Sequence, residues 1–370
     1  MANALRSLKL DGFKSIKSLD LQLDDLTVLI GANGSGKSNF VDFFRMLRAI
    51  ADEGLQSFVQ SQGGGDGFFF LGPKHTPRIE AEMAFGSNRY QFELTPAMNG
   101  ILIEKEFVQY TGGQGIGTWQ PVGQGVFESR LKERRRDRGK SGSSKGVCHY
   151  VYEAISSWVV YHFHDTSMLA PMRRSQALRD REKFRHDASN IAAFLLHLRQ
   201  THDASYRLIR DTVRLIAPFF SDFQLLPERR GNEEVVRLEW NQKGSDFPFQ
   251  PHHLSDGTMR FICMATALLQ PTLPSTILID EPELGLHPSA IAVLSDLVKS
   301  CAARTQVILS TQSPTLLDHF QPEQIVVVNR VGPESEFKRL EGAGLADWLD
   351  DYSVGELWQK NVVRAGPTHG

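Results

Sequence analysis

Cysteine, long apolar runs and an excess of either charge are all scarce in this sequence. Its three cysteines, Cys148, Cys263 and Cys301, form no CxxC pair, so neither a zinc site nor a disulfide framework is indicated. No run approaches the roughly 18 apolar residues of a membrane span, and the N-terminus lacks the apolar core of a signal peptide. A formal net charge of −2 creates no global field for a polyanion. We therefore expect a cytoplasmic globular protein without membrane contact.

Strand-like alternation and helical spacing divide the chain into four segments. They are an N-terminal lobe with an antiparallel sheet (1–110), a flexible basic Gly/Ser-rich loop (111–147), an insertion of helices and strands (148–250) and a C-terminal α/β lobe (251–370). Within the insertion we expect a strand over 149–163 and helices over 186–219. Sustained heptads are missing, so no long coiled coil is predicted.

The stretch "GANGSGKS", Gly31 to Ser38, is a full P-loop pattern between a predicted buried strand and a predicted helix. Its glycines let backbone N–H groups converge on phosphate oxygens, and the helix adds its positive end. Lys37 supplies a charge for the β and γ phosphates, and Ser38 a hydroxyl for Mg²⁺. The pattern predicts an ATP site with bound Mg²⁺.

A second half of this site is predicted in "TILIDEPELGLHP". Its apolar residues indicate a buried strand, and acidic residues emerge at the carboxyl end, where open α/β sheets bind ligands. Asp280 is the candidate acid for Mg²⁺. Glu281 is the candidate general base for the attacking water.

The stretch "LSDGTMR", Leu254 to Arg260, precedes another apolar run. Small polar residues at this position suit a helix cap, because they satisfy unpaired backbone N–H groups. A helix N-terminus also binds anions. The residues alone leave both interpretations open.

Taken together, "GFKSI", "GANGSGKSN", "LSDGTMR", "ILIDEPELGLHP" and "VILSTQSP" resemble the SMC/RecF-like branch of ABC-type ATPases. The set looks closest to compact RecF- and OLD-like bacterial AAA-family ATPases without a coiled coil. The resemblance implies an α/β P-loop NTPase of the ABC-ATPase head type, with a mixed sheet core, an antiparallel β subdomain and a helical insertion. It covers most of the chain and is weakest over 61–250.

The resemblance also implies roles for individual residues. Those implied to hold nucleotide are Asn33, Gly34, Ser35, Gly36, Lys37, Ser38 and Asn39. Ser255 and Gly257 would cap the γ-phosphate held by the P-loop of a partner chain, so that ATP joins two copies. Asp256 departs from the small residue usual there. Gln312 stands where related ATPases often carry a catalytic His.

Similar ATPases imply Mg²⁺-dependent ATP hydrolysis in an anti-phage defence or DNA-maintenance system, with a homodimer or larger oligomer and a nuclease or toxin as effector. Two alternatives stay open, a non-catalytic ATP-gated scaffold and a DNA-repair ATPase. The basic stretch Lys132–Lys140 predicts either a solvated loop or a segment that binds the phosphate backbone of nucleic acid. "HFHD", with His162 and His164, favours core or edge histidines over a metal site.

Overall fold

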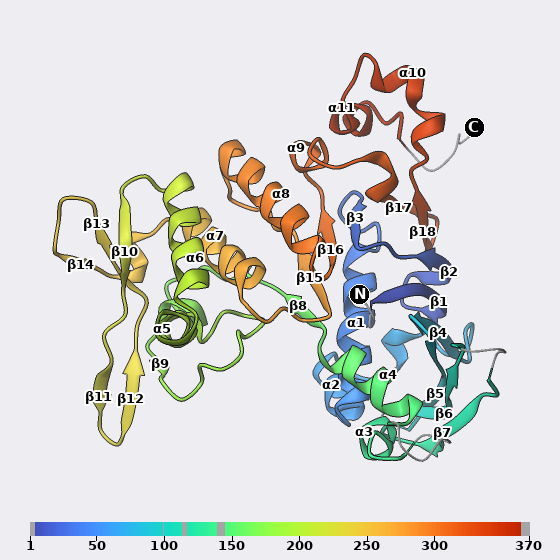
Figure 1. Cartoon of the computed structure of the whole chain (residues 1–370). Coiled ribbons are helices and arrows are strands. Elements are labelled where there is room, and N and C mark those ends of the chain that lie inside the picture. The colour runs from blue at the N-terminus through green and yellow to red at the C-terminus, as the bar shows by residue number, and fades with distance from the viewer. Residues whose placement is uncertain (1–3, 99, 113–116, 139–144, 364–370) are drawn as a thin grey trace.

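A six-stranded mixed sheet forms the centre of the molecule (Figure 1), and the computed structural model describes residues 4–98, 100–112, 117–138 and 145–363. In spatial order its strands are β18 (Glu334–Arg339), β17 (Ile325–Val331), β3 (Leu26–Ile30), β16 (Gln306–Thr311), β15 (Thr276–Asp280) and β8 (Val159–Tyr161). Neighbouring strands run parallel except in the β17–β18 hairpin. β3 and β16 are buried throughout, as expected of strands covered on both faces.

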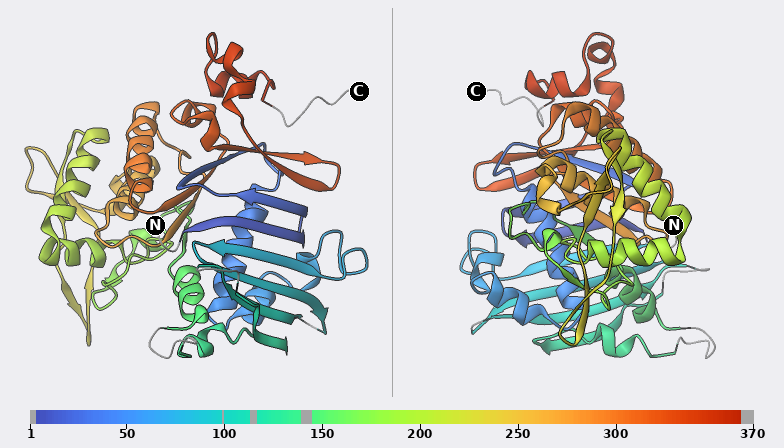
Figure 2. Two further views of the ribbon diagram at one scale, coloured as in Figure 1. Left: turned by 45° about the vertical axis from the view of Figure 1, so that its right-hand side comes forward. Right: turned by 90° about the vertical axis from the view of Figure 1, so that its left-hand side faces the viewer.

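A second sheet of six antiparallel strands lies beside the first and is seen side-on in the left view of Figure 2. Its strands, in spatial order, are β2 (Ile16–Gln22), β1 (Leu5–Phe13), β4 (Ile79–Phe85), β5 (Asn88–Ala97), β6 (Gly100–Tyr110) and β7 (Gln120–Val126). In β4, buried and half-buried residues alternate strictly, because successive side chains of a strand point to opposite faces. The meander therefore lies where alternation predicts it.

Helix α1 (Lys37–Ala51) lies between the two sheets. Its Phe40 and Phe44 belong to one hydrophobic cluster with Phe92 of the antiparallel sheet and Leu29 of the central sheet. The next residue in β3, Ile30, belongs to the cluster on the opposite face of the central sheet. One strand thus packs against both cores.

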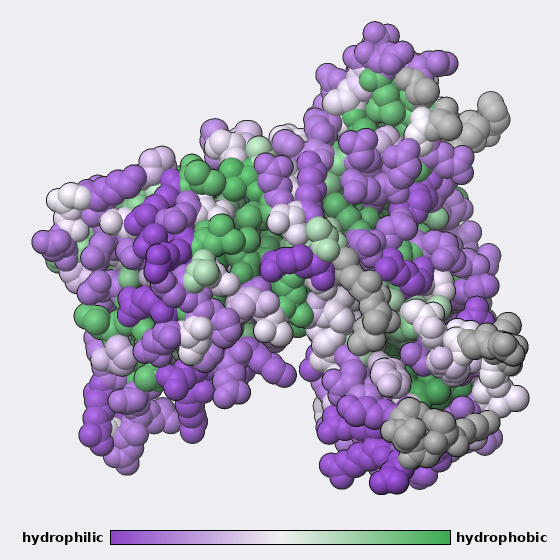
Figure 3. Space-filling view, viewed as in Figure 1, coloured by the Kyte–Doolittle hydropathy of each residue, from purple (hydrophilic) through white to green (hydrophobic). Residues whose placement is uncertain are grey.

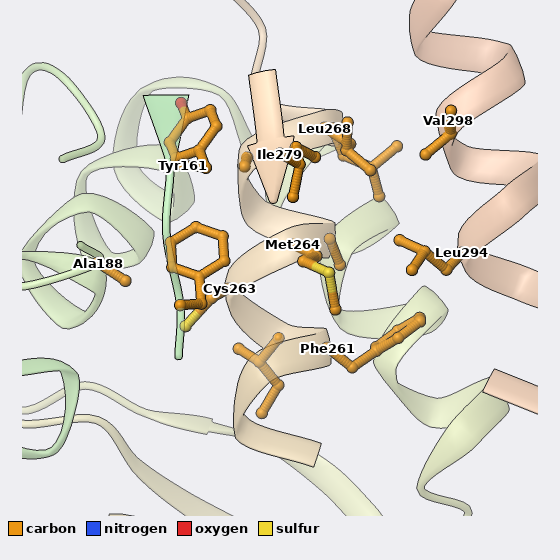
Figure 4. Packing of buried hydrophobic residues seen from close by; sticks show 14 of the residues in the cluster. Tyr161, Ala188, Phe261, Cys263, Met264, Leu268, Ile279, Leu294 and Val298 are labelled. Carbon is orange, nitrogen blue, oxygen red and sulfur yellow. The ribbon is translucent and has the colours of Figure 1, made fainter. Parts of the chain in front are cut away.

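The opposite face is covered by α7 (Asp256–Leu269) and α8 (Pro288–Ala302). Except for Arg260, every residue of α7 from 259 to 269 is buried. Cys263 lies on the side of Ala188, while Phe261 lies on the side of Leu294 of α8 (Figure 4). An apolar surface around the whole helix is what a position between several layers requires.

A helical lobe with two small sheets continues this face away from the centre (Figure 1). Its elements are α5 (Ile191–Thr201), α6 (Asp203–Ile216), the sheet β10 (Phe220–Gln224), β13 (Glu239–Gln242) and β14 (Pro248–Phe249), and the sheet β11 (Glu228–Arg230), β12 (Glu233–Val236) and β9 (Gln176–Ala177). The remaining helices of four or more residues are α2 (Leu55–Ser61), α3 (Leu131–Arg134), α4 (Val147–Ser156), α9 (Pro314–Leu317), α10 (Ala346–Leu349) and α11 (Val354–Gln359).

Two sequence-based predictions about the middle of the chain are wrong. The segment 111–147 was expected to be a loop, but it contains β7 and α3; residues 113–116 and 139–144 lie outside the described residues. Residues 149–156, expected to be a strand, belong to α4. Cys148, Val151, Tyr152 and Ile155 are buried at helical spacing, which outweighs the strand propensity of valine and tyrosine.

The boundary predicted at residue 148 is also displaced. Helix α4 packs with the N-terminal lobe, through Val151 and Ile155, and β8 joins the central sheet.

No helix in the described part of the chain is long and apolar enough to cross a membrane.

Candidate active site

Of the five parallel strands of the central sheet, four (β3, β16, β15 and β8) are followed by a sequence motif at the same edge. The pairs Ile30↔Thr311 and Asp280↔Ser310 align the ends of β3, β16 and β15. On the outer side, Tyr161 at the end of β8 pairs with Ile279. The carboxyl edge of a parallel sheet is where α/β folds bind ligands.

The P-loop leads from β3 directly into α1. Gly36 precedes the helix with a φ of 114° and gives it no side-chain cap. A Cβ atom at Gly36 would overlap Ser335 Oγ, so both the backbone angle and the close approach require glycine. Lys37 Nζ donates to the carbonyl oxygens of Gly31, at 2.6 Å, and Ala32, at 3.1 Å.

The charge and burial of Lys37 suit the binding of an anionic ligand. Such a ligand would replace the loop carbonyl groups that accept the lysine's hydrogen bonds. Burial lowers the pKa of Lys37, while Glu281, Asp280 and Glu283 oppose this shift through their negative charge. The lysine ammonium therefore lies in the field of the carboxylates at the neighbouring strand end. Phosphate oxygens can replace the two carbonyl groups as its acceptors.

Unpaired polar groups show that the loop fits a polyphosphate and Mg²⁺. The first turn of α1 has no side-chain cap, and Ser35 Oγ is buried without a hydrogen-bond partner among the described residues. Asn33, Gly34 and Ser38 are exposed at the loop surface, and half-buried Asp280 ends the neighbouring strand. The Ser38 hydroxyl and the Asp280 carboxylate are the kinds of oxygen group that Mg²⁺ prefers, so these residues fit the ion.

Asn39 has a different contact from the other residues expected to bind nucleotide. Its Nδ2 donates to Ser15 Oγ at 2.5 Å, and Ser15 is in turn 2.7 Å from Ser335 Oγ. These two hydrogen bonds connect the first turn of α1 to the β1–β2 turn and to β18. The structure therefore gives Asn39 a role in supporting the loop.

Glu281 directly follows β15 in a strained backbone conformation. Its φ is 45°, a left-handed value that costs a non-glycine residue roughly 1–2 kcal/mol. The N–H of Glu281 donates to the carbonyl of Ser310 at 2.7 Å, and its Oε1 accepts a hydrogen bond from Gln312 Nε2. Gln312 and Glu281 are thus brought together, and the amide orients the carboxylate.

Glu283 is a site residue that the sequence analysis did not assign. Its Oε1 accepts from Thr311 Oγ1 at 2.6 Å and from the backbone N–H of Gln312 at 3.2 Å. Burial raises the pKa of Glu283. This carboxyl group fixes the start of the loop after β16, and with it the position of the Gln312 side chain.

His164, which the sequence analysis interpreted as a core or edge histidine, is a second residue of the site. It follows β8, and its Nε2 lies 3.2 Å from the carbonyl oxygen of Asp280 and 4.0 Å from Glu281 Oε2. Within the described residues, no group of three or more His, Cys, Asp or Glu side chains is placed so that it could hold a metal ion.

The stretch "LSDGTMR" begins α7, and Ser255 caps it. Ser255 Oγ accepts the N–H of Thr258 at 3.1 Å, and its side chain stays exposed. A Cβ atom at Gly257 would overlap the carbonyl oxygen of Gly285, so this glycine lets the helix start touch the loop after Glu281. The cap interpretation is therefore confirmed, and contact with an anion of another chain stays a prediction.

Asp256, the unusual residue of this stretch, is held by a buried arginine. Arg173 Nη2 lies 2.8 Å from Asp256 Oδ1, and their side chains are 5% and 64% exposed. Arg173 also donates to the carbonyls of Thr166, Pro251 and Leu254. The pair neutralises the acid and ties the segment after His164 to the start of α7.

Comparison with known proteins identifies the fold and family. The sequence profile of the family described as "AAA domain, putative AbiEii toxin, Type IV TA system" matches residues 26–318. The chain belongs to this family. No curated protein matches it.

Solved structures with the same fold include heads of SMC proteins. An Smc head bound to the C-terminal winged-helix domain of ScpA has 16% identity and a TM-score of 0.54, over 93% of this chain and 99% of that one. The Smc head from Pyrococcus furiosus, with an extended coiled coil and the C-terminal domain of ScpA, has 16% identity and a TM-score of 0.56, over 94% and 98%. The predicted SMC/RecF-like ABC-type ATPase head fold is confirmed.

The basic stretch Lys132–Lys140 is partly committed to contacts within the chain; residues 139 and 140 lie outside the described part. Lys132 Nζ lies 3.6 Å from Glu53 Oε2, Arg134 donates to the carbonyl of Pro121 at 2.5 Å, and Arg135 stacks 4.6 Å from the ring centre of Tyr152. Exposed Arg136 and Arg138 have no ion pair within the described residues.

Binding of nucleic acid by this stretch stays a prediction and centres on the two exposed arginines. Arg136→Glu combined with Arg138→Glu is expected to weaken binding of DNA oligomers. The slope of log affinity against log salt should become shallower by about 2, because two phosphate contacts are lost. Lys243→Glu, another exposed lysine, is the matched control for charge. Equal affinities and slopes in all three proteins would leave the stretch as a solvated surface.

Proposed function

We propose that the protein hydrolyses ATP at composite sites formed by two copies of the chain. One observation carries this proposal. Gln312 orients Glu281 through a hydrogen bond, and the negative charge of Glu281 acts to raise the pKa of the P-loop Lys37. Both residues therefore lie at the same edge of the central sheet. A base for water and a cation for phosphate at one strand edge are the two parts that phosphoryl transfer to water needs.

The P-loop residues bind the substrate phosphates. Lys37 gives up its bonds to Gly31 and Ala32 and donates to phosphate oxygens, and the first N–H groups of α1 add their positive ends. Ser38 and Asp280 would hold Mg²⁺. The ion neutralises charge on the phosphates when it is bound.

Glu281 accepts the proton of the attacking water in this proposal. Its left-handed backbone angle and the hydrogen bond from Gln312 hold its carboxylate in place before substrate arrives. Such preorganisation lowers the entropy lost on reaching the transition state. The amide N–H of Gln312 donates a hydrogen bond to the base, so Gln312 serves as a positioning residue.

Ser255 and Gly257 complete the site of a partner copy. Support for this comes from the exposed start of α7, because a helix N-terminus can bind an anion, and from the Arg173–Asp256 pair, which offsets the charge of the acid. ATP would then hold two heads together, and hydrolysis would release them. The description of the family as a toxin–antitoxin component supports a defence role for this cycle in bacteria.

His164 is proposed to hold the water or the metal ligands near Glu281. His164→Ala is expected to lower kcat about tenfold with KM for ATP nearly unchanged, since a hydrogen bond near a charged group is lost. His164→Gln should keep most activity, because an amide can still donate to the carbonyl of Asp280. Steady-state kinetics measure both.

His162→Ala is the matched control for this prediction. The two imidazole rings are tilted by 52° with centres 4.0 Å apart, but His162 is exposed and forms no hydrogen bond or ion pair with Glu281. It should therefore retain near wild-type kcat. A larger loss for His162→Ala than for His164→Ala would contradict the assignment.

A further inference from the structure

A cavity of about 820 Å³ lies beside the edge strand β8, at the end of the molecule away from the P-loop edge. It is lined by β8 and the residues just before it, by the residues just before β15, and by the second half of α1. Residues 182–186 and part of α5 line its other side. The two lobes are separated by a notch in the space-filling view (Figure 3). A volume of roughly 300–1,000 Å³ is typical of small-molecule sites, which often lie between domains.

Aromatic pairs form the two walls of this inter-lobe cavity. Phe44 and Trp158, with ring centres 5.1 Å apart, belong to the core of the N-terminal lobe. Phe184 and Phe194, 5.3 Å apart, belong to the core of the helical lobe. An apolar body inserted here would contact both cores at once.

The charged residues of the lining favour an anion. Four are cationic, Arg45, Arg48, Lys183 and Arg185, and two are acidic, Asp52 and Glu182, which leaves a formal charge of +2. The three arginines have carboxylate partners within the chain. Exposed Lys183 makes no ion pair with any described residue, so its charge remains available.

We propose that this cavity binds a small amphipathic anion, with a flat or aliphatic apolar body and one carboxylate, sulfonate or phosphate group. The body packs between the aromatic walls, and the anionic group lies at the Lys183 rim. Such a ligand would touch α1, which begins at Lys37, and β8, which leads to His164. It would also touch the residues before β15, the strand that leads to Glu281. Binding would therefore favour one relative position of the two lobes, and the geometry of the nucleotide site depends on that position.

The test uses the fluorescent anion 1-anilinonaphthalene-8-sulfonate with the full chain. We expect saturable binding at one site in the wild-type protein. Lys183→Glu should weaken it about fivefold, as expected for an exposed charge pair. His197→Trp, which places an indole in the cavity from half-buried His197 on α5, should abolish saturable binding. Lys243→Glu, at an exposed lysine outside the cavity, should bind as the wild type does.

Competition defines the ligand class and separates this site from the nucleotide site. Decanoate should displace the probe, whereas 1-decanol at the same concentration should not. Binding should persist in Lys37→Ala, which disables the P-loop, so the result does not depend on ATP hydrolysis. Non-saturable binding, wild-type affinity in both Lys183→Glu and His197→Trp, loss of binding in Lys37→Ala, or equal displacement by decanol would overturn the proposal. Circular dichroism confirms that each variant is folded.

Discussion

Glu281→Gln is expected to lower kcat for ATP hydrolysis by about 10²–10⁴-fold, the usual contribution of a general base. The glutamine has the same shape and can still accept the hydrogen bond of Gln312, but its amide cannot take a proton from water. ATP binding should be retained, because Lys37 and the P-loop are unchanged. Single-turnover hydrolysis and calorimetry measure the two effects separately.

The variant should also accumulate as a dimer in ATP, since the step that separates the heads is blocked. Glu283→Gln is the matched control, because it replaces the neighbouring carboxyl with an amide that can still accept from Thr311. It should lose less than about tenfold in kcat, the effect of one weakened hydrogen bond. Wild-type turnover in Glu281→Gln, or a dead Glu283→Gln beside an active Glu281→Gln, would contradict the assignment of the base.

The local parts of this site can be predicted from sequence because their patterns are contiguous. The P-loop needs a strand, glycines and a helix in order, and all three lie within residues 26–51. Asp280 and Glu281 follow an apolar run in the same way. Such motifs carry their own structural context, so composition and order are enough to place them.

The contacts that escaped prediction depend on pairings between distant segments. His164 reaches Glu281 because the three-residue strand β8 pairs with β15, more than a hundred positions later. Asp256 is neutralised by Arg173, 83 positions earlier. Neither the β8 segment before His164 nor Arg173 forms a periodic pattern in the sequence, because a three-residue strand and a single arginine are compatible with many local structures. Only the folded arrangement shows what each side chain faces.

The composite-site proposal predicts that Ser255→Arg binds ATP about as well as the wild type but fails to hydrolyse it. Ser255 caps α7 at an exposed position, so arginine there would place a bulky side chain where a partner's phosphate should dock. Loss of the cap costs only about 1 kcal/mol, too little to unfold a domain of this size. Thermal denaturation checks that the variant is folded. Lys243→Glu controls for a surface charge change.

Mixing two inactive variants then tests whether the site is shared. Lys37→Ala should also be inactive, but because it loses a charge from the phosphate site and binds ATP weakly. In a mixed dimer, one site joins the intact P-loop of the Ser255→Arg chain to the intact Ser255 of the other chain, and the second site carries both lesions. Partial return of ATPase activity on mixing is expected if the chains exchange. Hydrolysis by Ser255→Arg alone at the wild-type rate would limit this stretch to a helix cap and exclude a site shared between two chains.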